Sequence, residues 1–279
     1  MQFKNLSRLG LLALAGAALA AGQQAPLLNT VKQKLAEGKQ VVGGTINTSD
    51  PGVYCAMARA GFDVLWVEMQ HSPLSYDQVA KMIWACKDAP AIPFIRVPAA
   101  TEGDIQKATD IGALGIIVPM VDSVREAEDG VTYAKYPPRG KRSQGGGQYG
   151  RLWGPGYRAA ANDNIMVVVM IESPAGVEIV GEVAAIDGVD VVFAASGDIG
   201  SFTGWQRDDP RYMALIEEIK SETLKAGKIL AGPLSWRDRD GFMFFQGPAE
   251  GSLISEGAKI ALRRPAAEME DVATGDESH

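Results

Sequence analysis

His71 is the one histidine that can take part in chemistry within a fold, because the only other one, His279, is the last residue of an acidic C-terminal segment. This scarcity excludes sites built from several imidazoles, such as histidine-rich zinc centres. Any histidine acid or base must come from the segment 65–73, where an apolar run over 62–67 ends in Glu68, Gln70 and His71 before a Ser-Pro pair. The pattern predicts a buried strand with polar groups at its C-terminal end, which is where parallel α/β proteins carry out chemistry.

Three more polar residues stand where predicted strands end. Arg96 and Glu172 each close an apolar run, and Asp198 lies just after another. Each alone has an ordinary structural explanation, as an ion-pair partner, a helix cap or a turn residue. Together with Glu68 and His71 they converge on one rim of a parallel barrel, and five such residues favour a site.

The residue types at this rim indicate carbon–carbon bond chemistry. Two carboxylates, Glu172 and Asp198, without Cys or His beside them suit a hard divalent ion such as Mg²⁺ or Mn²⁺. Arg96 is expected to stabilise an enolate oxygen, and His71 to move protons. Glu68 is expected to fix the tautomer of the imidazole and raise its basicity. A glycosidase, which also uses two carboxylates, is weaker because it leaves Arg96 and His71 without roles.

Strand and helix patterns alternate along the chain and predict a single (β/α)8 TIM barrel. The expected strands are 41–46, 64–68, 91–96, 115–118, 165–171, 189–194, 228–231 and 241–245. The expected helices are 52–60, 75–87, 102–111, 123–133, 176–185, 210–226 and 249–262. A doubly wound sheet is the competing architecture, but no phosphate-binding turn follows a strand. The G-x-G-x-x-G spelling at 145–150 follows a loop, so the nucleotide interpretation fails.

The two ends of the chain are set apart from the barrel domain, which is predicted to span 21–264. Residues 1–20 have the form of a secretory signal, with Lys4 and Arg8 before an apolar stretch and a small-x-small cleavage site. The stretch is too short to span a bilayer, and no Cys stands just after the cleavage site to carry a lipid anchor. An exported protein, periplasmic in a bacterium, is therefore expected. Residues 265–279 are predicted to be an acidic disordered tail.

Charge and cysteine content narrow the partners and the compartment. Removal of 1–20 lowers the 27 basic side chains by two, to 25 against 34 acidic ones, a net charge of −9. Nucleic acid and, after signal removal, membrane are therefore poor partners. Cys55 and Cys86 allow a disulfide in an oxidising compartment, but two buried free thiols are favoured, because the sequence gives no geometry.

Several motifs, in order along the chain, resemble the HpcH/HpaI aldolase family. They are Gly61-Phe62-Asp63 with the strand ending in His71, Ile95-Arg96-Val97-Pro98, Gly112-Ala113-Leu114-Gly115-Ile116-Ile117-Val118-Pro119, Tyr136-Pro137-Pro138-Arg139-Gly140, Met170-Ile171-Glu172-Ser173 and Gly188-Val189-Asp190. The resemblance covers about 29–262.

The resemblance implies a barrel of the phosphoenolpyruvate/pyruvate type that cleaves and forms 4-hydroxy-2-keto acids with a divalent cation, Mg²⁺, Mn²⁺ or Co²⁺. It implies that Glu172 and Asp198 hold the metal, that Arg96 contacts the keto oxygen, and that His71 acts as a base through a water. Substrate binding is assigned to Ser196, Gly197, Asp198 and Arg96, with the main-chain N–H groups of 197 and 198 on the carboxylate. The partners implied are a small keto acid and an aldehyde, and a homo-oligomer, trimer or hexamer, in which the last helix packs on a neighbouring subunit.

The chain departs from the family pattern at the site. The usual Asp-x-Glu-His is Glu68-Met69-Gln70-His71, and the usual Gly-Pro-x-Asp turn is Ala195-Ser196-Gly197-Asp198. Met170 stands where some members have a Gln. These changes leave open whether the keto product is pyruvate.

Alternatives remain for the function and for one loop. The second hypothesis is an acyl-CoA lyase of the citrate-lyase β type, which would need a basic surface for the CoA phosphates. Arg139, Lys141 and Arg142 provide only a weakly basic one. The third hypothesis is a non-catalytic exported binding protein. A class I aldolase mechanism needs a lysine at the C-terminal ends of the strands, and the sequence pattern predicts none there. The glycine-rich loop 143–158 is expected to be a surface or subunit-contact loop, and a lid whose aromatic residues line an aldehyde pocket is the sharper alternative, with Trp66 and Trp205 contributing.

Overall fold

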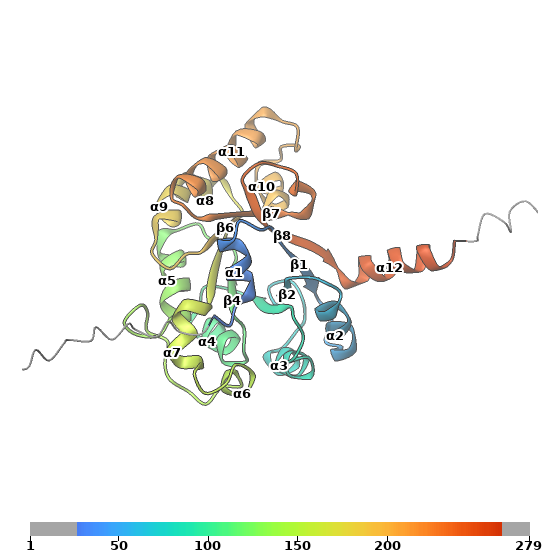
Figure 1. Cartoon of the computed structure of the whole chain (residues 1–279). Helices are drawn as coiled ribbons and strands as arrows, with labels where there is room; N and C mark the ends of the chain where they lie inside the picture. Colours follow the sequence, from blue (N-terminus) through green and yellow to red (C-terminus); the bar gives the residue numbers. More distant parts are fainter. Residues whose placement is uncertain (1–26, 264–279) are drawn as a thin grey trace, which may run out of the picture.

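Eight parallel strands close into a barrel in chain order, with β8 paired to β1 (Figure 1). The computed structural model describes residues 27–263, so the predicted signal, the acidic tail and His279 lie outside the described residues. The strands are β1 Val41–Ile46, β2 Val64–Glu68, β3 Ile92–Arg96, β4 Gly115–Val118, β5 Met166–Ile171, β6 Val191–Ala194, β7 Ile229–Pro233 and β8 Phe242–Ala249. The predicted (β/α)8 barrel is confirmed.

Helices connect the strands, and most of them cover the outside of the barrel. They are α1 Thr30–Ala36, α2 Pro51–Arg59, α3 Tyr76–Ala85, α4 Glu102–Asp110, α5 Val124–Ala134, α6 Tyr149–Leu152, α7 Tyr157–Asn164, α8 Pro174–Glu178, α9 Val180–Ala185, α10 Ser196–Thr203, α11 Pro210–Lys225 and α12 Glu250–Ala261, with a short 3₁₀ turn at Leu234–Trp236. The sequence missed α1, α6, α7 and α10. All four are no longer than eight residues, too short to show a helical period.

Large side chains fill the inside of the barrel in layers. Phe94 on β3 meets Phe244 on β8, with ring centroids 5.7 Å apart. Trp66 on β2 meets Phe193 on β6 edge to face at 5.3 Å. Because alternate residues of a strand face the same way, the next inward positions toward the C-terminal ends are Glu68, Arg96 and Gln246. The packed core therefore ends in a polar layer.

Helix α1 covers the opposite, N-terminal end of the barrel. Asn29, its N-cap, is fully buried and donates to the carbonyl oxygens of Leu114 and Asn164, just before β4 and β5. Lys32 and Lys34 form ion pairs with Asp190 and Asp63, which precede β6 and β2. These contacts tie α1 to the starts of four strands, which leaves the C-terminal end of the barrel as the accessible end.

Cys55 on α2 and Cys86 at the end of α3 form a disulfide, with 5.4 Å between their Cα atoms. The expectation of two free thiols was wrong. The sequence could not show that α2 and α3 pack side by side, which brings two cysteines 31 residues apart within bonding distance.

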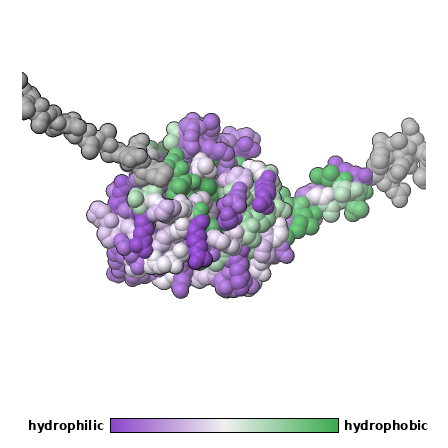
Figure 2. All heavy atoms as spheres, turned by 60° about the horizontal axis from the view of Figure 1, so that its bottom comes forward, coloured by the Kyte–Doolittle hydropathy of each residue, from purple (hydrophilic) through white to green (hydrophobic). Residues whose placement is uncertain are grey.

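Helix α12 leaves the barrel and projects into solvent (Figure 1). Its first turn is held where the main-chain N–H of Asn47 donates to the Glu250 carboxylate at 2.8 Å. Beyond that turn every side chain is exposed, and several are apolar, as the green atoms on the projecting segment show (Figure 2). Within 27–263, no helix combines the length and the apolar character needed to cross a bilayer.

Candidate active site

A cavity of about 330 Å³ opens at the C-terminal ends of the strands. The residues that line it are His71, Arg96, Met170, Phe193, Ala195, Ser196, Gly197, Asp198, Pro233 and Gln246. They come from β2, β3, β5, β6, β7 and β8 or from the residues directly after those strands. The structure thus brings His71, Arg96, Ser196, Gly197 and Asp198 together around one cavity, while Glu68 and Glu172 are buried beside it.

Glu68 and Arg96 form a buried ion pair, with Glu68 Oε2 2.5 Å from Arg96 Nε. The two residues are neighbours in the β2–β3 register, and 4% and 10% of their side chains are exposed. The Arg96 guanidinium also lies over the Trp66 ring at 5.9 Å and directs Nη1 to the Met170 sulfur at 3.7 Å. Arg96 is therefore held on one side by a carboxylate and keeps other donors for a ligand.

The second oxygen of Glu68 holds the turn that carries His71. Glu68 Oε1 accepts the main-chain N–H groups of Gln70 and His71 at 2.8 and 3.0 Å. No hydrogen bond joins Glu68 to the imidazole, so the expectation that it sets the tautomer of His71 is corrected: its contacts position Arg96 and the turn. Glutamate is one methylene longer than the aspartate of the family pattern, and both of its oxygens are taken up by these contacts.

The His71 side chain is exposed at the edge of the cavity. Its ring makes no hydrogen bond to any residue within 27–263. The neighbouring Ser72 hydroxyl donates to the Glu68 carbonyl oxygen and fixes the turn, so the backbone is ordered while the ring stays available. A solvent-facing imidazole at a cavity edge can exchange a proton with a ligand through a water.

Glu172 is a buried carboxylate with an unsatisfied oxygen. It is 2% exposed, and Oε1 has no hydrogen-bond partner among the described residues. Burial, and then the nearby Asp198 charge, raise the pKa of Glu172 to about 7, against the opposing effect of Arg96. A buried acceptor without a partner destabilises the folded state, so a hydrogen-bond donor or a cation bound at this oxygen would be stabilising.

Met120, after β4, is a contributor that the sequence did not reveal. Its main-chain N–H donates to the Glu172 carboxylate, which lowers the pKa of that group. Met120 has φ of 52°, in the left-handed region that non-glycine residues seldom adopt. Such strain is found where the surrounding structure requires it, here to aim an amide at Glu172.

The pair of Glu172 and Asp198 fits a hard divalent cation. One carboxylate is buried with a free oxygen, and the other is exposed on the cavity wall in the first turn of α10. No cluster of three His, Cys, Asp or Glu side chains forms a metal site within 27–263. The two carboxylates would therefore leave several coordination positions to water and ligand, which is usual for Mg²⁺ and Mn²⁺.

The start of α10 presents free main-chain donors to the same cavity. Ala195 is the N-cap, and its own N–H donates to the Ile171 carbonyl oxygen at 3.0 Å. The next N–H groups, of 196, 197 and 198, belong to the first turn and have no intrahelical acceptor. The Tyr212 hydroxyl fixes this turn by donating to the Ser196 carbonyl oxygen at 3.1 Å. The turn can bind a carboxylate without any particular side chain.

Gln246 on β8 is the other residue that the sequence reasoning missed. It lines the cavity and its amide makes no hydrogen bond to another described residue. The signal was present: Phe244 faces the barrel interior, so two residues further along Gln246 must face inward as well. The predicted strand 241–245 stopped one residue short of it.

The loop 143–158 does not cover this cavity, so the hypothesis of an aromatic lid was wrong. It connects α5 to β5, and connections that precede a strand lie at the N-terminal end of a parallel barrel. Trp153 donates there to the Gly112 carbonyl oxygen at 3.0 Å, before β4. Trp66 is fully buried in the barrel core, and Trp205 lies under Arg211. None of these rings lines the cavity.

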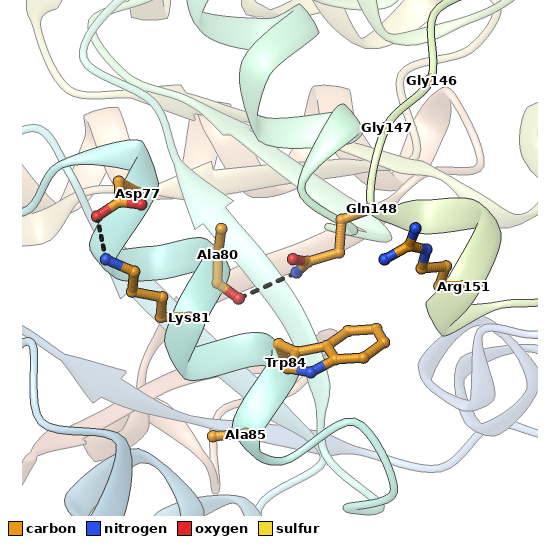
Figure 3. A pocket seen from close by; sticks show the side chains of 9 residues that line it. All are labelled: Asp77, Ala80, Lys81, Trp84, Ala85, Gly146, Gly147, Gln148 and Arg151. Carbon is orange, nitrogen blue, oxygen red and sulfur yellow. Dashed lines mark hydrogen bonds and ion pairs between the residues drawn. The ribbon is translucent and has the colours of Figure 1, made fainter.

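A larger cavity, about 590 Å³, lies between this loop and α3 (Figure 3). Gln148 crosses it to donate to the Ala80 carbonyl oxygen at 3.0 Å, and Trp84 and Arg151 line it. It contains none of the seven predicted site residues. The smaller cavity at the strand ends has the convergent charges and the unsatisfied carboxylate, so the chemistry is assigned there.

Comparison with known proteins agrees with this geometry. The sequence profile of the family described as HpcH/HpaI aldolase/citrate lyase matches residues 46–229. A hydroxypyruvate/pyruvate aldolase of Deinococcus radiodurans is 34% identical over 221 residues, which cover 77% of this chain and 79% of that protein. A 4-hydroxy-2-oxovalerate aldolase of Novosphingobium aromaticivorans is 31% identical over 249 residues, covering 85% and 94%.

The fold is also close to that of solved structures. A crystal structure of an HpcH/HpaI aldolase/citrate lyase family protein from Burkholderia cenocepacia J2315 superimposes with a TM-score of 0.77 at 25% identity. The match covers 84% of this chain and 98% of that one.

Proposed function

Because the chain belongs to the HpcH/HpaI aldolase/citrate lyase family, we propose that it is a divalent-metal-dependent aldolase that cleaves or forms a 4-hydroxy-2-keto acid. The observation that carries the proposal is the meeting of Arg96, His71 and Asp198 around one cavity beside the unsatisfied carboxylate of Glu172. The products are a small 2-keto acid, pyruvate or hydroxypyruvate, and an aldehyde.

The chain offers a distinct group for each part of such a substrate. The main-chain N–H groups at the start of α10 bind the keto-acid carboxylate. Arg96, held by Glu68, donates to the keto oxygen and stabilises the negative charge that develops there. Glu172 and Asp198 hold the divalent cation, which supplies Lewis-acid polarisation of the carbonyl when bound.

Proton transfer falls to the edge of the cavity. In cleavage, the 4-hydroxyl loses a proton, the C3–C4 bond breaks, and an aldehyde leaves behind the enolate of the keto acid. His71, through a water, accepts the hydroxyl proton, and the enolate is protonated at C3 to give the keto acid. Condensation follows the same steps in reverse.

Competing functions have less support. Of the three residues that might bind CoA phosphates, Arg142 is buried and paired with Asp110, Arg139 is paired with Asp163, and Lys141 with Glu102. They lie around the connection from α5 to β5, away from the cavity. Lys135 and Lys228 also stand before strands, at the wrong end for a Schiff base. The retained charges argue against a non-catalytic protein.

A panel of 4-hydroxy-2-keto acids, incubated with the protein and Mn²⁺, tests the function by release of aldehyde. We expect turnover of at least one acid, and a loss of at least about a hundredfold in the Glu172→Ala variant. Failure to cleave any acid, or full activity in Glu172→Ala, would contradict the proposal.

We also propose that the protein is exported. The support is the leader-like sequence of residues 1–20 together with the Cys55–Cys86 disulfide, a bond that persists in oxidising compartments. A fusion of residues 1–30 to alkaline phosphatase, expressed in a bacterium, should be active in the periplasm. An inactive fusion, beside an active control carrying a known leader, would contradict export.

A further inference from the structure

A second cavity, of about 180 Å³, lies at the N-terminal end of the barrel. Four basic residues line it, namely Lys32, Lys135, Arg139 and Lys228, with Asp187 and Asp190 as the acidic ones. It sits among the end of α5 and the residues before β6 and β7, opposite the catalytic cavity. A space of this size is below that of pockets for drug-sized ligands, so it suits a small ion or the end group of a larger molecule.

Lys135 brings a buried ammonium group to this cavity. The residue is 3% exposed, and Nζ donates to the carbonyl oxygens of Asn162, at 3.0 Å, and Ile165. An ammonium group has three N–H donors, so one donor has no acceptor among the described residues.

Lys228 repeats the arrangement from the other side. Its Nζ donates to the carbonyl oxygens of Ile186 and Val189, at 3.1 and 2.8 Å, and again one donor is left. Within 27–263, neither Lys135 nor Lys228 forms an ion pair with a carboxylate, whereas Lys32 is paired with Asp190 at 3.1 Å. Two partly desolvated positive charges therefore share one cavity without a directly bound negative charge.

Capping of helix ends explains only part of this geometry. The carbonyls of Asn162, Ile165 and Ile186 lie at the ends of α7 and α9, where lysines commonly satisfy free carbonyl oxygens. The Val189 carbonyl lies in the turn before β6. Together these four carbonyl oxygens account for two donors of each lysine. They do not account for the third donor of each. Arg139, at the wall of the same cavity, is paired with Asp163 through Nη1 and keeps its other guanidinium donors for a ligand.

We propose that this cavity binds a small oxyanion, for which inorganic phosphate is the probe. The oxyanion accepts the remaining donors of Lys135 and Lys228 and is neutralised further by Arg139 and Lys32. Burial lowers the pKa of Lys135 to about 8, although the Asp190 charge opposes the shift, so an anion in contact with the ammonium group would favour its charged form. Bound there, the ion links the segment before β5 to those before β6 and β7 and stabilises the barrel. The inference is independent of the aldolase activity.

Isothermal titration calorimetry of the wild-type protein with phosphate, in chloride buffer with a chelator, tests the site. We expect saturable binding, and a thermal unfolding temperature that rises with phosphate but not with sodium chloride of equal ionic strength. Arg139→Gln should weaken binding at least about tenfold, because it removes a charged donor from a half-exposed position without disturbing the core.

Two controls separate this site from others. Lys81→Gln, at an exposed lysine outside the cavity, should bind phosphate as the wild type does. Arg96→Gln should do so too, since any phosphate in the catalytic cavity would depend on Arg96. No saturable heat in the wild type, or equal binding in Arg139→Gln, would overturn the proposal, as would loss of binding in Arg96→Gln.

Discussion

Glu68 shows how one side chain can organise two others. Its two oxygens bind Arg96 and the main chain of the turn at His71, so a single buried carboxylate holds both the guanidinium and the turn that carries the imidazole at the cavity. A buried charge is tolerated because it is fully paired. The imidazole has no hydrogen-bond partner within 27–263, so the proposed role of His71 in proton transfer can be tested by substitution with little effect on the fold.

The substitution His71→Ala should lower the turnover number for cleavage by about 10²- to 10⁴-fold, the usual range for loss of a general base. The thermal unfolding temperature should stay within about one degree of the wild type, since the exposed ring makes no internal hydrogen bond. Steady-state assays of aldehyde release and calorimetry measure the two effects. Full activity in this variant would mean that the proton is handled without His71.

Gln246 should govern the choice among substrates. Its free amide can bind a hydroxyl on a keto acid or aldehyde, so Gln246→Leu should reduce kcat/KM for hydroxylated substrates about tenfold. Substrates that lack the hydroxyl should be affected little, because Leu keeps similar volume. Paired assays with hydroxypyruvate and pyruvate check the ratio, and an equal loss for both would refute a role in selection.

The strands could be predicted from the sequence, and the short helices could not. The strands β2, β3 and β5 are apolar runs that end in Glu68, in Arg96 or directly before Glu172, so both the barrel and most of the rim could be inferred from the sequence. Three features depend on packing between elements, and the periodicity of a sequence does not reveal such packing. They are the partners of Glu68, the strained backbone at Met120 and the Cys55–Cys86 bond.

The junction of α5 and β5 contains a lysine whose charge should make stability depend on pH. Burial lowers the folded pKa of Lys135 from 10.5 to about 8. Between pH 8 and 10.5 the unfolded chain therefore binds more protons at this residue, so the free energy of unfolding rises with pH in that window. Below pH 8, burial of the charged ammonium group lowers the free energy of unfolding by its full amount, at most on the order of 3 kcal/mol.

The variant Lys135→Met removes this titration. The wild type should gain stability relative to the variant as the pH rises from 8 to 10, which urea unfolding in chloride buffers can measure. Titrations of all other groups cancel in the comparison. A difference in unfolding free energy that stays constant with pH would show that Lys135 has an ordinary pKa.

Helix α12 has an apolar face that no other part of the described chain covers. On α12, Leu253, Ile254 and Ile260 lie on one stripe with the spacing of a packing face, and Ile254 and Ile260 are 62% and 65% exposed. Such a stripe indicates contact with another molecule. We propose that α12 packs on a second copy of this chain in a homo-oligomer.

Sedimentation velocity tests this assembly. The double variant Ile254→Asp with Ile260→Asp should sediment as a smaller species than the wild type, because it places charges in the apolar contact. Ser255→Asp adds a charge to the same helix beside the stripe and should leave the assembly intact. A wild-type protein that is monomeric at micromolar concentration would rule out the assembly.

The dependence of keto-acid release on a divalent cation tests whether Glu172 and Asp198 bind a metal that cleavage requires. The protein is treated with chelator, desalted and assayed for cleavage of its best 4-hydroxy-2-keto acid before and after addition of Mn²⁺. The pairing of buried Glu172 with Asp198 predicts that activity falls at least about a hundredfold and is restored by the metal. Undiminished cleavage after chelation, together with a borohydride-trapped adduct on a lysine, would contradict a metal-dependent aldolase mechanism.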